Sequence, residues 1–199
     1  MSRARASQAR AVWEPGALYA INGGEGWFYY GQVAARKGDI AFLRHRTSEV
    51  EARPQGALYY PLMSRVCMAR PSLGRALRSG QWHFLGRAQL HPDLAKPYGV
   101  ALCPVDTNNV QLLLYQDLPG QPATILKTWH ARIDDPEIQN FEVASIWDAE
   151  HHIPQRLKAD FGAEEADWHI TGPVWRHRKV KLEYARRFPD QPWHQLPTD

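Results

Sequence analysis

Short apolar runs separated by turn residues dominate the pattern of hydrophobic and polar positions at the start of this chain. The first run, residues 17–21, ends at the Asn-Gly-Gly cluster of residues 22–24, whose glycines allow the positive φ angles of a tight turn. The aromatic run 27–33 follows directly, and a second turn at 36–39 leads to a third run at 40–44. Three strands joined by short turns predict an antiparallel meander.

Further runs of strand length occupy the middle of the chain. Their length and their content of β-branched and aromatic residues favour strands, although short apolar runs remain ambiguous. These runs are residues 57–60, 82–86, 99–103, 110–115 and 124–129, with a hairpin turn expected at 106–109.

Helix signals are concentrated near the C-terminal end. The clearest helix is expected to begin at Pro154, which suits a first helical turn, and to end at Gly162, a good C-terminal cap. Residues 72–78 predict a single helical turn with Ser72 as its N-cap. The stretch 141–147 is compatible with strand or helix, and the sequence around residues 168–184 is expected to add one or two closing elements.

These elements predict an α+β fold that is mostly β, as a curved antiparallel sheet or a barrel-like meander with one or two short helices. Gly31 and Gly86 each follow a tryptophan by four residues on an expected strand, and such glycines often mark bulges or close backbone approach. We expect a disordered basic arm at residues 1–12, a strand-rich globular domain at 13–167, and a basic C-terminal extension at 168–199 packed on the same domain.

The cysteines and the apolar segments indicate the cellular compartment of the protein. Cys67 and Cys103 are the two cysteines, and each sits in an apolar run, as buried thiols in a reducing compartment do. The sequence has no apolar stretch near the roughly 20 residues that span a bilayer. The first residues lack the hydrophobic segment of a secretory signal, although their Arg, Ser and Ala content is shared with organelle transit peptides. We expect a cytoplasmic protein that does not bind membranes.

Charge changes sign along the chain. The net charge is +3, but residues 134–167 contain ten acidic and two basic side chains. This acidic segment therefore predicts a distinct patch, whereas the small net charge does not by itself indicate a nucleic-acid partner.

Sequence motifs that are typical of enzymes have little support in this chain. The glycines at 23, 24 and 26 lie between two expected strands, whereas a phosphate loop opens a helix. His151 and His152 adjoin carboxylates, but a metal-dependent hydrolase would need one of them, or His130, to converge with Asp148. We predict a protein that is not an enzyme and has no cofactor, no metal and no catalytic residues.

The C-terminal region mixes cations with aromatic residues. Such a mixture can grip phosphates and stack bases, and it can equally be the solvated face of a strand. The alternative function, a nucleic-acid-associated protein, would use Arg176, Arg178, Lys179, Lys181, Arg186 and Arg187.

Three segments carry a resemblance to a known family. The hairpin 16–33 resembles the first hairpin of the immunity protein 26 family, which neutralises bacterial toxins. The segment 82–86, followed by Pro97, is similar to its central tryptophan strand, and the helix 153–162 is similar to its ending. The resemblance spans roughly residues 14–162. It implies a binding protein whose partner is a cognate toxin, with the toxin's active site occluded.

The acidic segment would then face a basic toxin surface, as in a nuclease, with carboxylates in place of phosphates. The candidate contacts with the partner are Asp134, Asp135, Glu137, Glu142, Trp147, Asp148, Glu150, Glu164, Glu165, Asp167 and Trp168.

Overall fold

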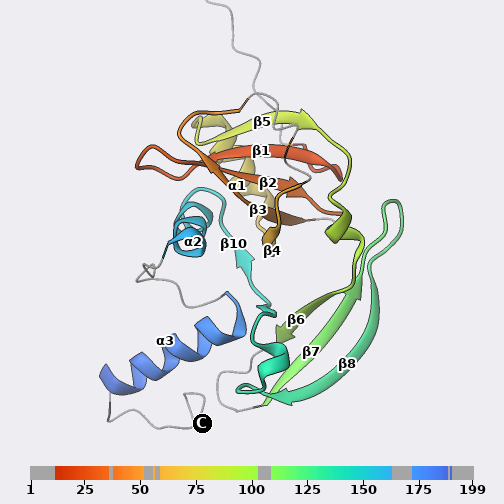
Figure 1. Cartoon of the computed structure of the whole chain (residues 1–199), viewed down its shortest axis with the longest axis vertical. Coiled ribbons are helices and arrows are strands. Elements are labelled where there is room, and N and C mark those ends of the chain that lie inside the picture. The colour runs from red at the N-terminus through yellow and green to blue at the C-terminus, as the bar shows by residue number, and fades with distance from the viewer. Residues whose placement is uncertain are drawn as a thin grey trace, which may run out of the picture.

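Two separate β-sheets form the frame of the molecule, with helices beside them (Figure 1). The computed structural model describes residues 12–35, 38–51, 56, 59–102, 109–162, 172–187 and 189. The predicted α+β fold, mostly β, is confirmed, and most of the strand pairs are antiparallel. The sheets do not close into a barrel, and three α-helices are present where one or two were predicted.

The first sheet has six strands in the order β10-β4-β3-β2-β1-β5. Their bounds are Ala17–Asn22 for β1, Phe28–Val33 for β2, Asp39–Thr47 for β3, Leu62–Met68 for β4, Trp82–Arg87 for β5 and Ile146–Trp147 for β10. Strands β1 to β3 pair antiparallel in chain order, which is the predicted meander, and β4 extends it. Strand β5 returns to the other edge of β1, so the sheet extends on both sides of the first hairpin.

The two strand glycines lie at irregularities of this sheet, as predicted. The register between β2 and β3 shifts between Tyr29 and Gly31, and the register between β1 and β5 shifts where Gly86 faces Leu18. Gly86 has a φ of 108°, which L side chains rarely adopt. Both shifts are bulges, which increase the local twist and curve the sheet.

The second sheet has four strands in the order β8-β7-β6-β9. Their bounds are Tyr98–Leu102 for β6, Asn109–Gln116 for β7, Thr124–Arg132 for β8 and Glu142–Val143 for β9. The ambiguous stretch 141–147 thus divides into two short strands, with β9 joining the second sheet and β10 joining the first. This stretch is a covalent link between the sheets.

The fourth strand was predicted in the wrong place. Tyr59 and Tyr60 lie in a turn, and the strand that pairs with β3 begins at Leu62. Alternating burial along β4, with Ser64, Val66 and Met68 turned inward, fixes its register. The polar residues between these positions masked the strand in the sequence.

The helices are α1 at Arg70–Arg78, α2 at His152–Phe161 and α3 at Val174–Arg187, with short 3₁₀ turns at Pro92–Ala95 and Pro136–Ile138. Gly162 caps the end of α2, as predicted. Ser72 is not the N-cap of α1: Ala69 holds that position, and the Ser72 hydroxyl donates to the Ala69 carbonyl from inside the first turn. The C-terminal region forms a helix, not a strand. None of the described helices is long and apolar enough to cross a membrane.

Each sheet has its own hydrophobic core. The larger cluster packs the first sheet against α1 and α2 and includes Tyr19, Trp82 and Leu157. The smaller cluster lies on the second sheet and includes Leu112 and Val174. The predicted arm 1–12 and the predicted turn 106–109 fall almost entirely outside the described residues.

Candidate functional site: a cleft between the two sheets

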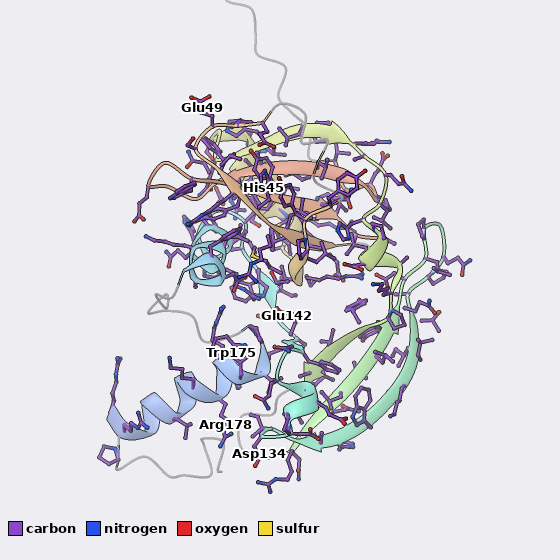
Figure 2. The ribbon with its side chains drawn as sticks, in the orientation of Figure 1. His45, Glu49, Asp134, Glu142, Trp175 and Arg178 are labelled. Carbon is purple, nitrogen blue, oxygen red and sulfur yellow. The ribbon has the colours of Figure 1, made fainter. Side chains whose placement is uncertain are left out.

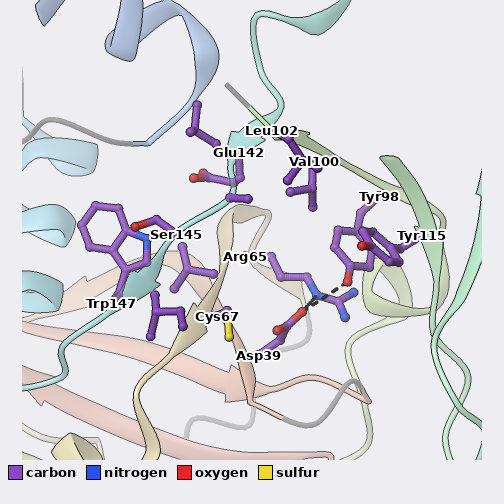
Figure 3. A pocket seen from close by; sticks show the side chains of 14 residues that line it. Asp39, Arg65, Cys67, Tyr98, Val100, Leu102, Tyr115, Glu142, Ser145 and Trp147 are labelled. Atoms are coloured by element: carbon purple, nitrogen blue, oxygen red, sulfur yellow. Dashed lines mark hydrogen bonds and ion pairs between the residues drawn. The ribbon is translucent and has the colours of Figure 1, made fainter. Parts of the chain in front are cut away.

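A cleft of about 390 Å³ lies between the two sheets (Figure 3). Strands β3, β4 and β10 supply one side, and strands β6, β7 and β9 supply the other. The lining residues are Asp39, Arg65, Val66, Cys67, Tyr98, Val100, Leu102, Tyr115, Glu142, Val143, Ala144, Ser145, Ile146 and Trp147.

The two faces of the second sheet explain why this cleft is apolar. One face, with Ala101 and Leu112, packs into the smaller core. Residues on a strand alternate between faces, so Val100 and Leu102 of β6 lie on the opposite face, and both line the cleft. Both residues are half-buried. An aliphatic wall is therefore accessible from the cleft.

An ionic cluster closes one end of the cleft. The Arg65 guanidinium donates to Asp39 (3.2 Å) and pairs with Asp117. The same guanidinium stacks over the Tyr98 ring at 3.6 Å, and the Tyr98 hydroxyl donates to Asp39 (3.3 Å). Tyr98 also stacks with Tyr115, with ring centroids 5.6 Å apart. Since these groups come from β3, β4, β6 and β7, the cluster fixes the spacing of the two sheets at this end.

A second ionic cluster holds Glu142 at the other end. Both terminal nitrogens of Arg156 donate to the Glu142 carboxylate (2.5 and 3.1 Å), and Nε of Arg156 donates to Asp160 (2.7 Å). Arg176 of α3 pairs with the other oxygen of Asp160 (2.9 Å). This cluster joins β9, α2 and α3. A bidentate guanidinium–carboxylate pair is the geometry that best compensates buried charge.

Burial perturbs both partners of this pair. Burial acts to lower the pKa of Arg156, but the charges of Glu142 and Asp160 outweigh it, and the pKa lies above its ordinary value. Burial raises the pKa of Glu142, and the charge of Arg156 opposes that rise. The carboxylate therefore depends on Arg156 to remain charged in this environment.

The remaining polar groups of the cleft are Cys67 and Ser145, and none of the lining residues is a histidine. Cys67 is half-buried and is not in a disulfide among the described residues. The carboxylates and the guanidinium of the lining take part in the two ionic clusters. What the cleft offers to a ligand is a set of aromatic and aliphatic walls with carboxylates at both ends.

The predicted acidic contacts do not form one surface among the described residues. Glu142 is in the buried cluster described above, and Trp147 is 3% exposed and packs in the larger core. Asp148 and Glu150 both accept from Arg75 of α1. Glu164, Glu165, Asp167 and Trp168 lie outside the described residues.

Three acidic residues do gather, in the turn that follows β8. Asp134 accepts two hydrogen bonds from Arg132 (2.9 and 3.1 Å), Asp135 caps the following 3₁₀ turn, and Glu137 is exposed. The hydrogen bond from Arg132 lowers the pKa of Asp134, and the charge of Arg178 on α3 adds to the effect. Figure 2 shows Arg178 and Asp134 on neighbouring segments. Among the described residues of the predicted patch, these three are the ones that gather in one acidic turn.

One geometric observation bears on the metal site that the histidines could form. Ligand atoms of Asp148, Glu150 and His151 lie within 4.8 Å of one another, whereas His152 and His130 do not join such a group among the described residues. The Arg75 guanidinium contacts both carboxylates, so it already supplies the positive charge at this place. We assign no metal site here.

The basic residues of α3 have different environments. Arg176 is buried against Asp160, Arg178 is half-buried, and Lys179, Arg186 and Arg187 are exposed. The side chain of Lys181 lies outside the described residues. Arg176 thus serves in the internal ionic cluster, and the exposed cations are fewer than the sequence indicated.

Strand β8 is a surface feature that the sequence did not indicate. It forms an edge of the second sheet, and most of its nine residues are exposed. Ile125 and Leu126 are 52% and 48% exposed, although their apolar character predicted burial. The apolar run itself was recognised as a strand, but nothing in its residues tells an edge strand from a central one.

Comparisons with protein-family models, with curated proteins and with solved structures find no match for this chain.

Proposed function

We propose that this chain is a non-enzymatic binding protein that holds a protein partner along strand β8 and the acidic turn after it. The single observation that carries the proposal is the exposed edge of the second sheet. An edge strand presents unpaired backbone groups that can add a strand from another chain, and native proteins usually blunt such edges. The edge carries two adjacent exposed apolar residues, Ile125 and Leu126, at a register shift opposite Leu114 and Tyr115.

The apolar and charged residues along this surface indicate the chemistry of a complementary partner segment. The apolar half of β8 leads through Lys127 and His130 to the acidic turn with Asp135 and Glu137. A matching partner segment is extended, is apolar at one end and is basic at the other. Complementary charge at the rim would accelerate association and set the register of the added strand.

The resemblance to the immunity protein 26 family supplies the biological form of this proposal. The partner is then a bacterial toxin with a basic active-site face, and binding along β8 and the acidic turn occludes that face. Support from the structure is limited to the strand-rich α+β fold and to the exposed acidic turn. A toxin gene directly beside the gene for this chain is the expected genomic context.

Co-expression with that toxin tests the proposal. The chain is expected to protect cells and to copurify with the toxin. In the double variant Ile125→Asp/Leu126→Asp, binding should weaken by at least about thirtyfold, because charged groups replace an apolar anchor worth about 2 kcal/mol. The matched control is Val50→Asp, which changes an exposed apolar residue of the connection between β3 and β4.

Two outcomes would refute the proposal. One is protection that persists unchanged in the double variant. The other is a homodimer of the free chain, seen by light scattering, that the double variant converts to a monomer, because β8 would then pair with a second copy. The nucleic-acid alternative is tested by salt-sensitive retention on heparin that Lys179→Ala/Arg186→Ala/Arg187→Ala abolishes.

A further inference from the structure

The cleft between the sheets has the size of a small-molecule site. Its volume of about 390 Å³ falls in the range of about 300–1,000 Å³ that is typical of ligand pockets. For comparison, an apolar cavity of roughly 150 Å³ holds one benzene ring. A molecule of two fused rings with a short side chain therefore fits the available space.

The walls of the cleft are suited to a flat apolar group. Val100 and Leu102 of β6 line the cleft from the second sheet, and Ile146 of β10 lines it from the first. The stacked rings of Tyr98 and Tyr115 continue the first wall. Aliphatic and aromatic walls favour an aromatic ligand, because its apolar faces leave water when they contact these walls.

The charged residues of the lining select the sign of a ligand's charge. Glu142 is compensated by its bidentate pair with Arg156, whereas the Arg65 cluster sets two carboxylates, Asp39 and Asp117, against one guanidinium. Arg65 itself lies over the Tyr98 ring at 3.6 Å, so an aromatic surface of this cleft already accepts a cation. The Arg65 cluster therefore has an excess of negative charge, which repels a carboxylate ligand and attracts an ammonium group.

We propose that the cleft binds a small aromatic molecule that carries one positively charged nitrogen. The ring lies between β6 and β10, and the charged nitrogen points toward the Arg65 cluster. This site is separate from the outer edge of β8, and the proposal does not depend on a protein partner. It assigns a ligand to a cavity that the protein-binding function leaves unused.

A pair of probes that differ in charge but share a ring tests the proposal. Tryptamine is a cation at neutral pH, and indole-3-propionate is an anion with the same ring. Calorimetric titration of the full chain is expected to show binding of tryptamine, with the anion at least about tenfold weaker. The variant Ser145→Phe fills the cleft from the β9–β10 loop and is expected to lose tryptamine binding by at least about tenfold.

The matched control is Ser48→Phe, which adds the same ring at an exposed turn and should bind tryptamine as the wild-type chain does. A second readout comes from Cys67, because its thiol lines the cleft. In a Cys103→Ser background, saturating tryptamine should slow alkylation of Cys67 by iodoacetamide several-fold, and indole-3-propionate should not.

The proposal is overturned if both probes bind equally, or if Ser145→Phe binds tryptamine like the control. A third result would also overturn it: neither probe slows alkylation of Cys67, and Ser145→Phe abolishes binding of the protein partner. The cleft would then hold a side chain of that partner and not a small molecule. Failure of the β8 variants to affect any partner would refute the proposed function and leave the tryptamine result unaffected.

Discussion

At the scale of single residues, burial shifts the pKa of Tyr19 in a way that the sequence does not reveal. Its ring is fully buried between Trp82 and Phe84, and its hydroxyl donates to the Val12 carbonyl (2.6 Å) and accepts from the Val12 amide (3.0 Å). Burial raises its pKa to about 12, against a smaller lowering effect of the hydrogen bond. The folded state therefore holds this proton more tightly than the unfolded state.

This shift predicts a specific alkaline transition. A raised pKa contributes stability below the unfolded value of about 10, and that stability is lost as the pH rises toward 12. The variant Tyr19→Phe should show a smaller loss of unfolding free energy between pH 10 and pH 12 than the wild-type chain. Urea unfolding at several pH values measures this, with Tyr59→Phe, at an exposed tyrosine, as the control. Parallel pH profiles for all three proteins would contradict the assignment.

At the scale of elements, the buried ionic cluster decides how α3 is attached. Sequence patterns placed Arg176 among the candidate nucleic-acid contacts and Glu142 among the toxin contacts, because charged residues are usually exposed. In the structure both belong to the cluster centred on Arg156 and Asp160. Only the relative placement of β9, α2 and α3 brings these four side chains together, and no local pattern contains that placement.

Removal of Arg156 should destabilise the fold in a pH-dependent way. Arg156→Met leaves Glu142 buried without the guanidinium that contacts it, whereas Asp160 keeps Arg176. The loss should be about 3–5 kcal/mol at neutral pH, as for other broken buried pairs.

The sign of the pH dependence follows from Glu142. Its folded pKa is already raised by burial, and loss of Arg156 raises it further. Stability from a raised carboxyl pKa is present below the unfolded value of about 4.3 and is lost as the pH rises through the folded value. The deficit of Arg156→Met should therefore grow from pH 4 to pH 8 in urea unfolding. Arg75→Met, at an exposed pair, is the control and should cost about 0–1 kcal/mol at all these pH values. A deficit that does not change with pH would contradict this account.

At the scale of the whole molecule, the sequence predicted the local elements and not their assembly. The meander β1–β3 and strands β5 to β8 follow from alternating apolar positions and turn residues, which act over a few neighbours. The division into two sheets depends on residues 142–147, where two adjacent short strands join different sheets. The cleft follows from that division. It was not predicted, because its residues come from distant segments such as those of Arg65, Tyr98 and Trp147.

The two cores predict two units of stability. The hydrophobic clusters share no residue, and the described links between the sheets are the β5–β6 connection at residues 88–97, the short β9–β10 segment and the two ionic clusters. Leu112→Ala removes a fully buried side chain from the smaller core and should reduce the stability of the second sheet by about 2–5 kcal/mol.

Amide hydrogen exchange measures which of the two sheets loses stability in Leu112→Ala. We expect faster exchange in β6 and β7 with little change in β2 and β3, because local opening of the second sheet leaves the larger core packed. Leu73→Ala, at a fully buried residue of the larger core, should produce the reverse pattern. Equal acceleration in both sheets by either variant would show that the ionic clusters and the β9–β10 link couple the sheets into one cooperative unit. In that case the cleft between them could not open independently of global unfolding.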